Sequence, residues 1–99
     1  MGATNFVTKS KGKTAMESFK KAIKEAQWEH GHGGYTGTIA EKDSFIMIDY
    51  EKEKKEFESP SDFIGRLMDE DDDRISNKWG PAGCIKFKDE WVFFGLASE

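Results

Sequence analysis

Apolar side chains recur every three or four residues between positions 15 and 26, and this spacing predicts an amphipathic helix. Thr14 stands before the repeat and Glu17 follows three positions later, which is the capping-box arrangement typical of a helix N-terminus. Gly31 supplies a C-terminal cap. The pattern therefore predicts a helix over residues 14–30.

Shorter apolar segments predict a sheet. Residues 3–9 are rich in strand-forming side chains and are expected to form an N-terminal strand. Two further pairs of segments, 38–40 with 45–50 and 84–87 with 91–96, are each separated by a short polar turn and predict two hairpins. The expected sheet is therefore mainly antiparallel.

A second, shorter helix is predicted after Ser59, because Pro60 suits the first helical position and Asp62 the first turn. Its buried side would be formed by Phe63, Ile64, Leu67 and Met68. The 99 residues are thus expected to fold as one α+β domain, with one long and one short helix beside the sheet.

Composition and charge exclude several function classes. The net charge is −4, and the six lysines and three glutamates of residues 1–34 leave the rest of the chain with a net charge of −7. Nucleic acid is therefore not the expected partner, since its backbone requires a basic face. One cysteine excludes an internal disulfide framework, and no segment reaches the roughly 20 apolar residues of a membrane span. Without a secretory signal pattern at the N-terminus, we expect a soluble, cytoplasmic protein without membrane contact.

The segment from Gly31 to Gly37 holds four glycines in seven residues. Glycine allows close approach of a ligand to the main chain, and successive backbone N–H groups can form an anion-binding nest. A plain connecting loop is the alternative interpretation, because the glycines follow a helix, whereas those of phosphate-binding loops precede one. The predicted ligand-binding residues are Lys11, Lys13, His30, Gly31, His32, Gly33, Gly34, Tyr35, Thr36 and Trp79. In this hypothesis Trp79 stacks on the ligand, and Lys11 or Lys13 neutralises its charge.

The two histidines allow a weaker catalytic hypothesis, a small hydrolase that uses His30 or His32. A metal site is not expected, since the His-x-His spacing has no third ligand in a supporting motif, and no cofactor is implied. Cys84 is expected to be a small core residue. The acidic run 69–73 lacks the spacing of a calcium loop and is either a solvated loop or a surface for a basic partner.

Trp28 is predicted on the face of its helix opposite the apolar stripe, among lysines. Such a residue either covers lysine stems or docks into another subunit. The last strand places aromatic side chains on both of its faces, and two helices are expected to cover only one face of the sheet. A homo-oligomer is therefore expected to bury the other.

Two segments, EHGHGGYTGTIAEK over residues 29–42 and KWGPAGC over residues 78–84, resemble a family of small uncharacterised proteins from bacteriophage and bacterial genomes. The resemblance implies no residue roles. The chain is also similar in general character, by analogy only, to phage proteins that sequester nucleotide signals of host immunity.

The leading hypothesis is a non-enzymatic protein that binds or sequesters a small phosphorylated or nucleotide-like molecule, as a phage counter-defence protein would. The alternative is a protein-interaction inhibitor that uses Trp28 and the acidic run 69–73 against a host protein. The small histidine-dependent hydrolase is the third.

Overall fold

The computed structural model describes residues 3–30 and 37–98. In chain order the elements are β1 (Ala3–Lys11), α1 (Ala15–His30), the 3-10 helix η1 (Ile39–Glu41), β2 (Phe45–Met47), α2 (Tyr50–Glu53), α3 (Pro60–Asp69), β3 (Ala82–Phe87) and β4 (Glu90–Ser98). The four strands form one sheet in the order β1-β4-β3-β2. β4 is antiparallel to both of its neighbours, whereas β2 runs parallel to β3. The α+β prediction is confirmed, with a mixed sheet.

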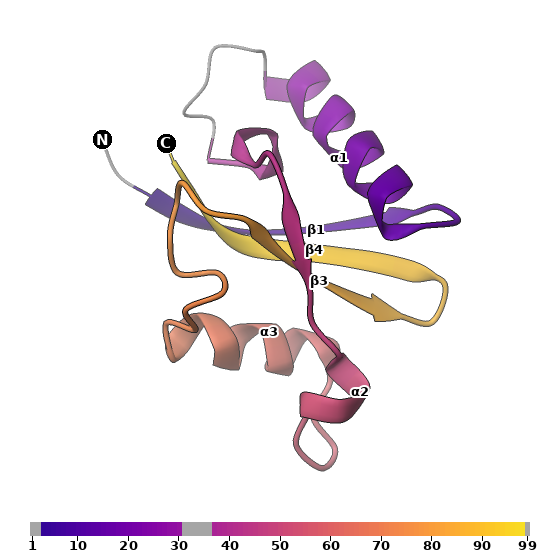
Figure 1. Cartoon of the computed structure of the whole chain (residues 1–99), viewed down its shortest axis with the longest axis vertical. Coiled ribbons are helices and arrows are strands. Elements are labelled where there is room, and N and C mark those ends of the chain that lie inside the picture. Colours follow the sequence, from indigo (N-terminus) through magenta and orange to yellow (C-terminus); the bar gives the residue numbers. More distant parts are fainter. Residues whose placement is uncertain (1–2, 31–36, 99) are drawn as a thin grey trace.

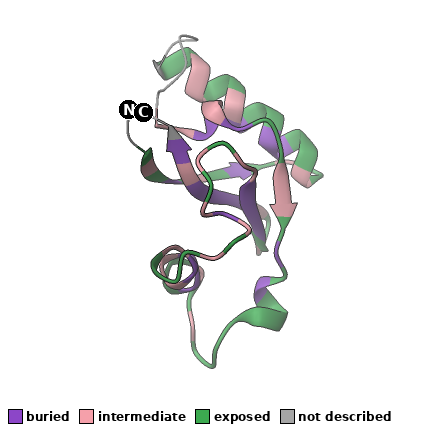
Figure 2. Cartoon of the chain, turned by 60° about the vertical axis from the view of Figure 1, so that its left-hand side comes forward, coloured by how far each residue is buried: buried purple, intermediate pink, exposed green. Residues whose placement is uncertain are grey.

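The molecule has three layers, with α1 on one face of the sheet and α3 on the other (Figure 1). Alternate residues of β4 supply the two cores, because successive side chains of a strand point to opposite faces. Phe93 packs under α1, together with Phe19, and Phe94 packs over α3, together with Phe63. Figure 2 shows buried residues along the strands and exposed residues on the outer sides of the helices.

Local capping signals predicted both longer helices. The Thr14 hydroxyl accepts a hydrogen bond from the Glu17 backbone N–H at 3.1 Å at the start of α1. The Ser59 hydroxyl accepts one from Asp62 N–H at 3.2 Å, and Pro60 opens α3. The N-terminal strand and the closing β3–β4 hairpin also form as predicted.

The predicted hairpin of residues 38–40 with 45–50 is wrong. Residues 39–41 form η1 instead, capped by the Thr38 side chain, and Ile39 is buried beneath α1. Phe45–Met47 pair in parallel with the start of β3, and the Ser44 carbonyl accepts from Ala82 N–H at 3.0 Å. The polar turn therefore leads to a strand on the far side of β3, and the connection between these parallel strands includes α3.

The expectation that two helices cover a single face is also wrong. Each helix covers its own face, since the inward side of α1 joins one core and that of α3 joins the other. A bare sheet face therefore gives no reason for an oligomer. None of the helices in the described ranges has the length and apolar character needed to cross a membrane.

The charged segment 51–58 overlaps the short helix α2, which the Asp49 carboxylate caps. In the turn that follows, Phe57 is almost fully exposed and has a positive φ of 64°. Glu58 closes this turn, because its carboxylate accepts two hydrogen bonds from Arg66, each at 2.9 Å. These contacts lower the pKa of Glu58 to about 2.

Candidate functional site: a lysine-rimmed groove along helix α1

Most of the predicted ligand-binding residues cannot be placed. Gly31, His32, Gly33, Gly34, Tyr35 and Thr36 lie outside the described residues, and His30 is described only as the last residue of α1. Lys11 ends β1 and Lys13 stands just before α1, whose 16 residues span about 24 Å. The two lysines therefore lie at the opposite end of α1 from His30. The structure does not bring them together with that end of the helix.

Trp79 lies in the loop that leads into β3, and a buried lysine holds this loop. Lys42 is only 2% exposed, and its ammonium donates hydrogen bonds to the carbonyls of Asn77, Lys78 and Gly80 at 3.2, 3.2 and 2.9 Å. Burial lowers the pKa of Lys42. The structure thereby places the Trp79 loop beside the segment that follows the glycine-rich stretch.

Lys42 also lines a groove between α1 and residues 40–43. Two hollows that share lining residues lie along this part of the molecule, with volumes of about 390 and 630 Å³, and the larger one is next to Lys42. Met16, Phe19, Ile23 and Ala40 give that hollow an apolar lining. Its polar side chains are Lys20, Lys24, Gln27, Lys42 and Asp43. This hollow is therefore lined by three lysines and one carboxylate, in a protein whose net charge is −4.

Aromatic packing supports the floor of this groove. Phe19 is 3% exposed, and its ring lies 4.9 Å from the ring of Phe45 and 5.4 Å from that of Phe93, measured between centroids. Tilted ring pairs at this spacing are favourable. The floor is thus anchored in the core between α1 and the sheet.

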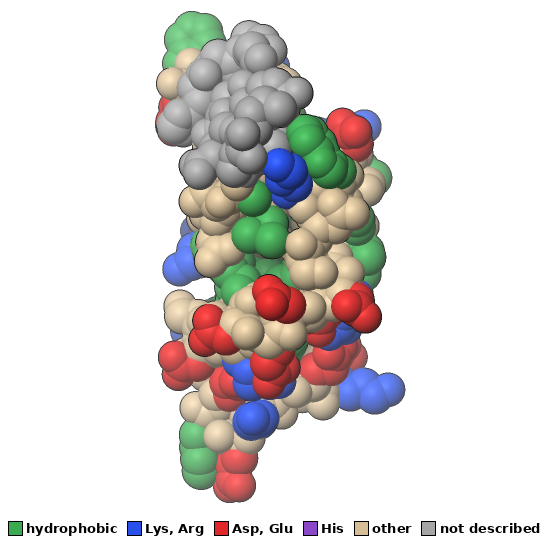
Figure 3. Space-filling view, turned by 90° about the vertical axis from the view of Figure 1, so that its left-hand side faces the viewer, with side chains coloured by type: hydrophobic (Ala, Val, Ile, Leu, Met, Phe, Trp, Pro, Cys, Tyr) green, Lys and Arg blue, Asp and Glu red, His purple; other side chains and the backbone are tan. Residues whose placement is uncertain are grey.

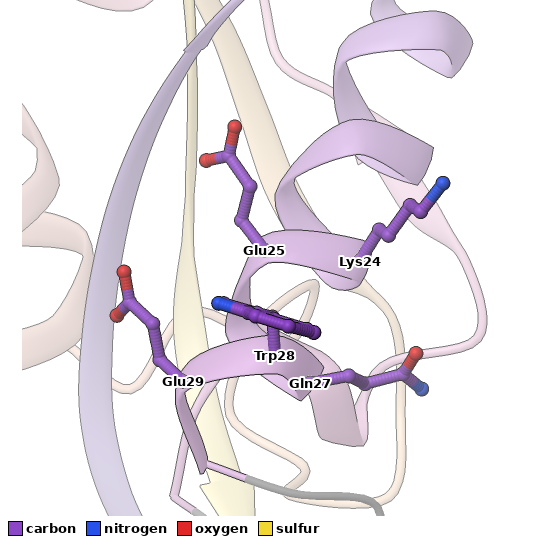
Figure 4. Close-up of a pocket in the computed structure, with 5 residues that line it drawn as sticks. All are labelled: Lys24, Glu25, Gln27, Trp28 and Glu29. Carbon is purple, nitrogen blue, oxygen red and sulfur yellow. The ribbon is translucent and has the colours of Figure 1, made fainter.

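The smaller hollow surrounds Trp28, which is 89% exposed at the C-terminal end of α1. Lys24 and Gln27 line both hollows, so the two are neighbours. Figure 4 shows Lys24 and Gln27 on one side of the indole ring, and Glu25 and Glu29 on the other. We call the combined surface of both hollows the α1 groove.

The exposure of Trp28 was predicted correctly, but the groove was not. The sequence placed the α1 lysines of the groove beside Trp28, but it predicted that Lys42 lies in a polar turn. The partners of Lys42 lie 35 to 38 residues further along the chain, so no local pattern signals its burial. Only the hydrophobic environment of Ile39 and Phe45 on either side of it hints that this segment is packed.

The acidic run 69–73 lies across the sheet from Trp28, because it follows α3. Acidic side chains gather in the lower half of the side of the molecule shown in Figure 3. Part of this charge is neutralised internally, since Arg74 contacts Asp72 at 2.8 Å and Glu53 at 2.9 Å. These contacts lower the pKa of both carboxyl groups. Trp28 and the acidic run therefore belong to different faces of the molecule.

The remaining candidates for chemistry are structural. Cys84 is fully buried in the core beneath α1, and burial raises the pKa of its thiol to about 12. The interpretation of Cys84 as a core residue is confirmed. Within residues 3–30 and 37–98, no group of His, Cys, Asp and Glu side chains is arranged to hold a metal ion.

Comparisons of the chain with protein-family models, with curated proteins and with solved structures gave no match.

Proposed function

We propose that the protein binds a small phosphorylated, nucleotide-like molecule in the α1 groove. The observation that carries the proposal is the convergence of Lys20, Lys24 and Lys42 on an apolar hollow that adjoins an exposed tryptophan. Ammonium groups recognise phosphate as point charges, and an indole ring offers a stacking surface to a nucleobase. A ligand with both parts matches both hollows.

The three lysines have different roles in this proposal. An ammonium group has three protons to donate, and Lys42 uses all three on backbone carbonyls. Lys42 therefore contributes positive charge and shape to the groove, whereas the exposed Lys20 and Lys24 donate hydrogen bonds to the phosphate. The Gln27 amide lies between the two hollows and is positioned to contact the sugar or base.

The proposed role is binding rather than catalysis. The polar side chains that line the described part of the groove are lysines, one amide and carboxylates. Of these groups, the lysines and the amide suit the binding of an anion. In a phage-encoded protein in the host cytoplasm, this binding would sequester a nucleotide signal, in line with the analogy of general character to phage proteins of that kind.

Isothermal titration calorimetry with ADP-ribose, AMP and a cyclic dinucleotide tests the proposal, with adenosine and inorganic phosphate as the two halves of the ligand. At least one nucleotide is expected to bind, and more tightly than either half. Trp28→Ala is expected to weaken binding about 5- to 150-fold, since stacking of a base on an aromatic ring contributes about 1–3 kcal/mol. Lys24→Glu is expected to weaken nucleotide binding more than Trp28→Ala does, and to remove most of the salt dependence of the affinity.

Lys21→Glu is the matched control, because Lys21 is exposed on the same helix but does not line either hollow. The affinity of this variant should stay within about twofold of the wild type. The proposal is wrong if no nucleotide binds, or if Lys21→Glu weakens binding as much as Lys24→Glu. Recovery of the nucleotide in altered form after incubation would instead favour the hydrolase.

Contact with a partner protein through α1 is a second candidate function. Met16 and Trp28 on this helix are 52% and 89% exposed, so both offer apolar area to a partner. Trp28→Ala would then abolish binding of a host protein. Charge reversal of residues 69–73 would leave that binding intact, because the acidic run lies on the other side of the sheet.

A further inference from the structure

The outer edge of β1 is a long and regular strand edge. β1 lies at one end of the strand order and pairs with β4 along all nine residues, from Ala3 opposite Ser98 to Lys11 opposite Glu90. The register advances without a break, so β1 contains no bulge. Half of its backbone N–H and C=O groups therefore point away from the sheet, toward any strand that could pair with them.

β1 has few of the features that protect an edge strand from pairing. Residues 3–8 contain no charge, proline or glycine, and only Lys9 and Lys11 place charge on the strand. The opposite edge of the sheet, β2, has just three residues. A long edge built of uncharged, strand-forming residues favours pairing with another chain.

Val7 at the centre of β1 is 54% exposed. Its neighbour Phe6 packs in the core beneath α1, so Val7 points to the other face of the sheet, where it and Lys9 lie beside the first turn of α3. The helix leaves Val7 incompletely covered. A strand placed against β1 would bury the exposed part of this side chain.

We propose that the strand that pairs with β1 is the β1 of a second copy of this chain, antiparallel and centred on Val7. The symmetry of this arrangement places Val7 opposite its own counterpart, Lys9 opposite Asn5 and Lys11 opposite Ala3. No two like charges face each other, and the two valines form a cross-strand apolar pair. The dimer has one continuous eight-stranded sheet.

The charge pattern of β1 makes the strand self-compatible, and this favours a second copy as its partner. In an antiparallel pair of identical strands, the basic end of each β1, with Lys9 and Lys11, meets the uncharged end of the other. An in-register parallel pair would bring the lysines of both copies together, at a cost in free energy. The proposal concerns a surface separate from the α1 groove and stands whether or not a nucleotide binds there.

Light scattering coupled to size-exclusion chromatography, over a series of protein concentrations, tests the dimer. The wild type is expected to show twice the chain mass of 11.3 kDa at high concentration and to approach 11.3 kDa on dilution. Val7→Lys should give 11.3 kDa at every concentration, because it places two ammonium groups opposite each other at the centre of the interface. Its circular dichroism spectrum should match that of the wild type, since Val7 is more than half exposed.

Met47→Lys is the matched control, because Met47 is 51% exposed on the strand at the opposite edge of the same sheet. This variant is expected to remain dimeric. Val7→Cys gives a second readout, which does not depend on disrupting the dimer or the fold. This variant should form a disulfide-linked dimer under mild oxidation, whereas Met47→Cys should not. A wild type that is monomeric throughout, or a dimer that Val7→Lys leaves intact, overturns the proposal. A monomer that instead pairs β1 with a strand of a different protein overturns it as well.

Discussion

Replacement of Lys42 by methionine removes the ammonium group that holds the loop before β3, while keeping a stem of similar length. Three hydrogen bonds are lost, from Lys42 to the carbonyls of Asn77, Lys78 and Gly80. The Asn77 carbonyl also accepts a hydrogen bond from Gly80 N–H at 2.9 Å, so loss of its bond from Lys42 should have the smallest effect on stability. The change therefore falls mainly on two carbonyls.

The free energy of unfolding is expected to fall by about 2–3 kcal/mol. A hydrogen bond to a charged group contributes about 1.5–3 kcal/mol net, so two such bonds at the lower end of the range set this figure. An opposing effect comes from the ammonium itself, because no carboxylate in the described residues forms an ion pair with it and its burial is unfavourable. The lowered pKa of Lys42 has the same cause.

Thermal and urea unfolding, followed by circular dichroism, measure this effect. For a domain of this size, the expected loss corresponds to a fall in Tm of about 10–20 °C. Lys24→Met is the control, since Lys24 is exposed, and its effect should stay within about 0.5 kcal/mol. Amide hydrogen exchange should increase at Gly80, which lies in the loop that Lys42 holds. If Lys42→Met is as stable as the wild type, the cost of burying the charge cancels its hydrogen bonds, and the reasoning is refuted.

Three further predictions concern the core and the ion pairs. Gly83→Ala should lower the free energy of unfolding by about 1–3 kcal/mol, because an added Cβ would lie 2.8 Å from the Phe94 ring and 2.9 Å from Ile75. Urea unfolding measures this loss. An unchanged midpoint would contradict the packing described. The pKa of Glu58 is lowered from 4.5 to about 2, so its pairing with Arg66 stabilises the fold fully above pH 4.5, and this stabilisation is lost as the pH falls toward 2. Glu58→Gln should flatten this part of the profile of stability against pH. An identical acid transition in the variant would show that the pair contributes nothing. The Cys84 thiol should not react with a thiol reagent in the native protein and should react fully in urea, since it is buried and its pKa is raised to about 12. Rapid labelling of the native protein would argue against its place in the core.

Elements with signals in their own sequence were predictable. The capping residues Thr14 and Ser59 marked the starts of α1 and α3, and the helical spacing of apolar residues placed Trp28 in solvent. The β3–β4 hairpin was predictable for the same reason, since its turn joins two adjacent apolar segments. In each case the residues that determine the structure lie within a few positions of one another.

Features that depend on distant partners were not predictable. Residues 38–50 have the pattern of a hairpin, but the burial of Ile39 beneath α1 and the contacts of Lys42 with residues 77–80 direct the chain to β3 instead. The α1 groove depends on the same segment, because one of its walls is formed by residues 40–43. An error in the topology therefore also concealed the candidate site.

The position of β4 has a consequence for biosynthesis. Among the described strands it follows all the others in the chain, yet it lies between β1 and β3 and is the strand partner of β1. β1 therefore cannot pair with β4 until residues 90–98 have left the ribosome. Helices α1 and α3 can form earlier from local contacts, but the core side of each stays without its sheet until then. During translation the apolar side of α1 is thus a surface that chaperones can bind, and it closes only when β4 arrives.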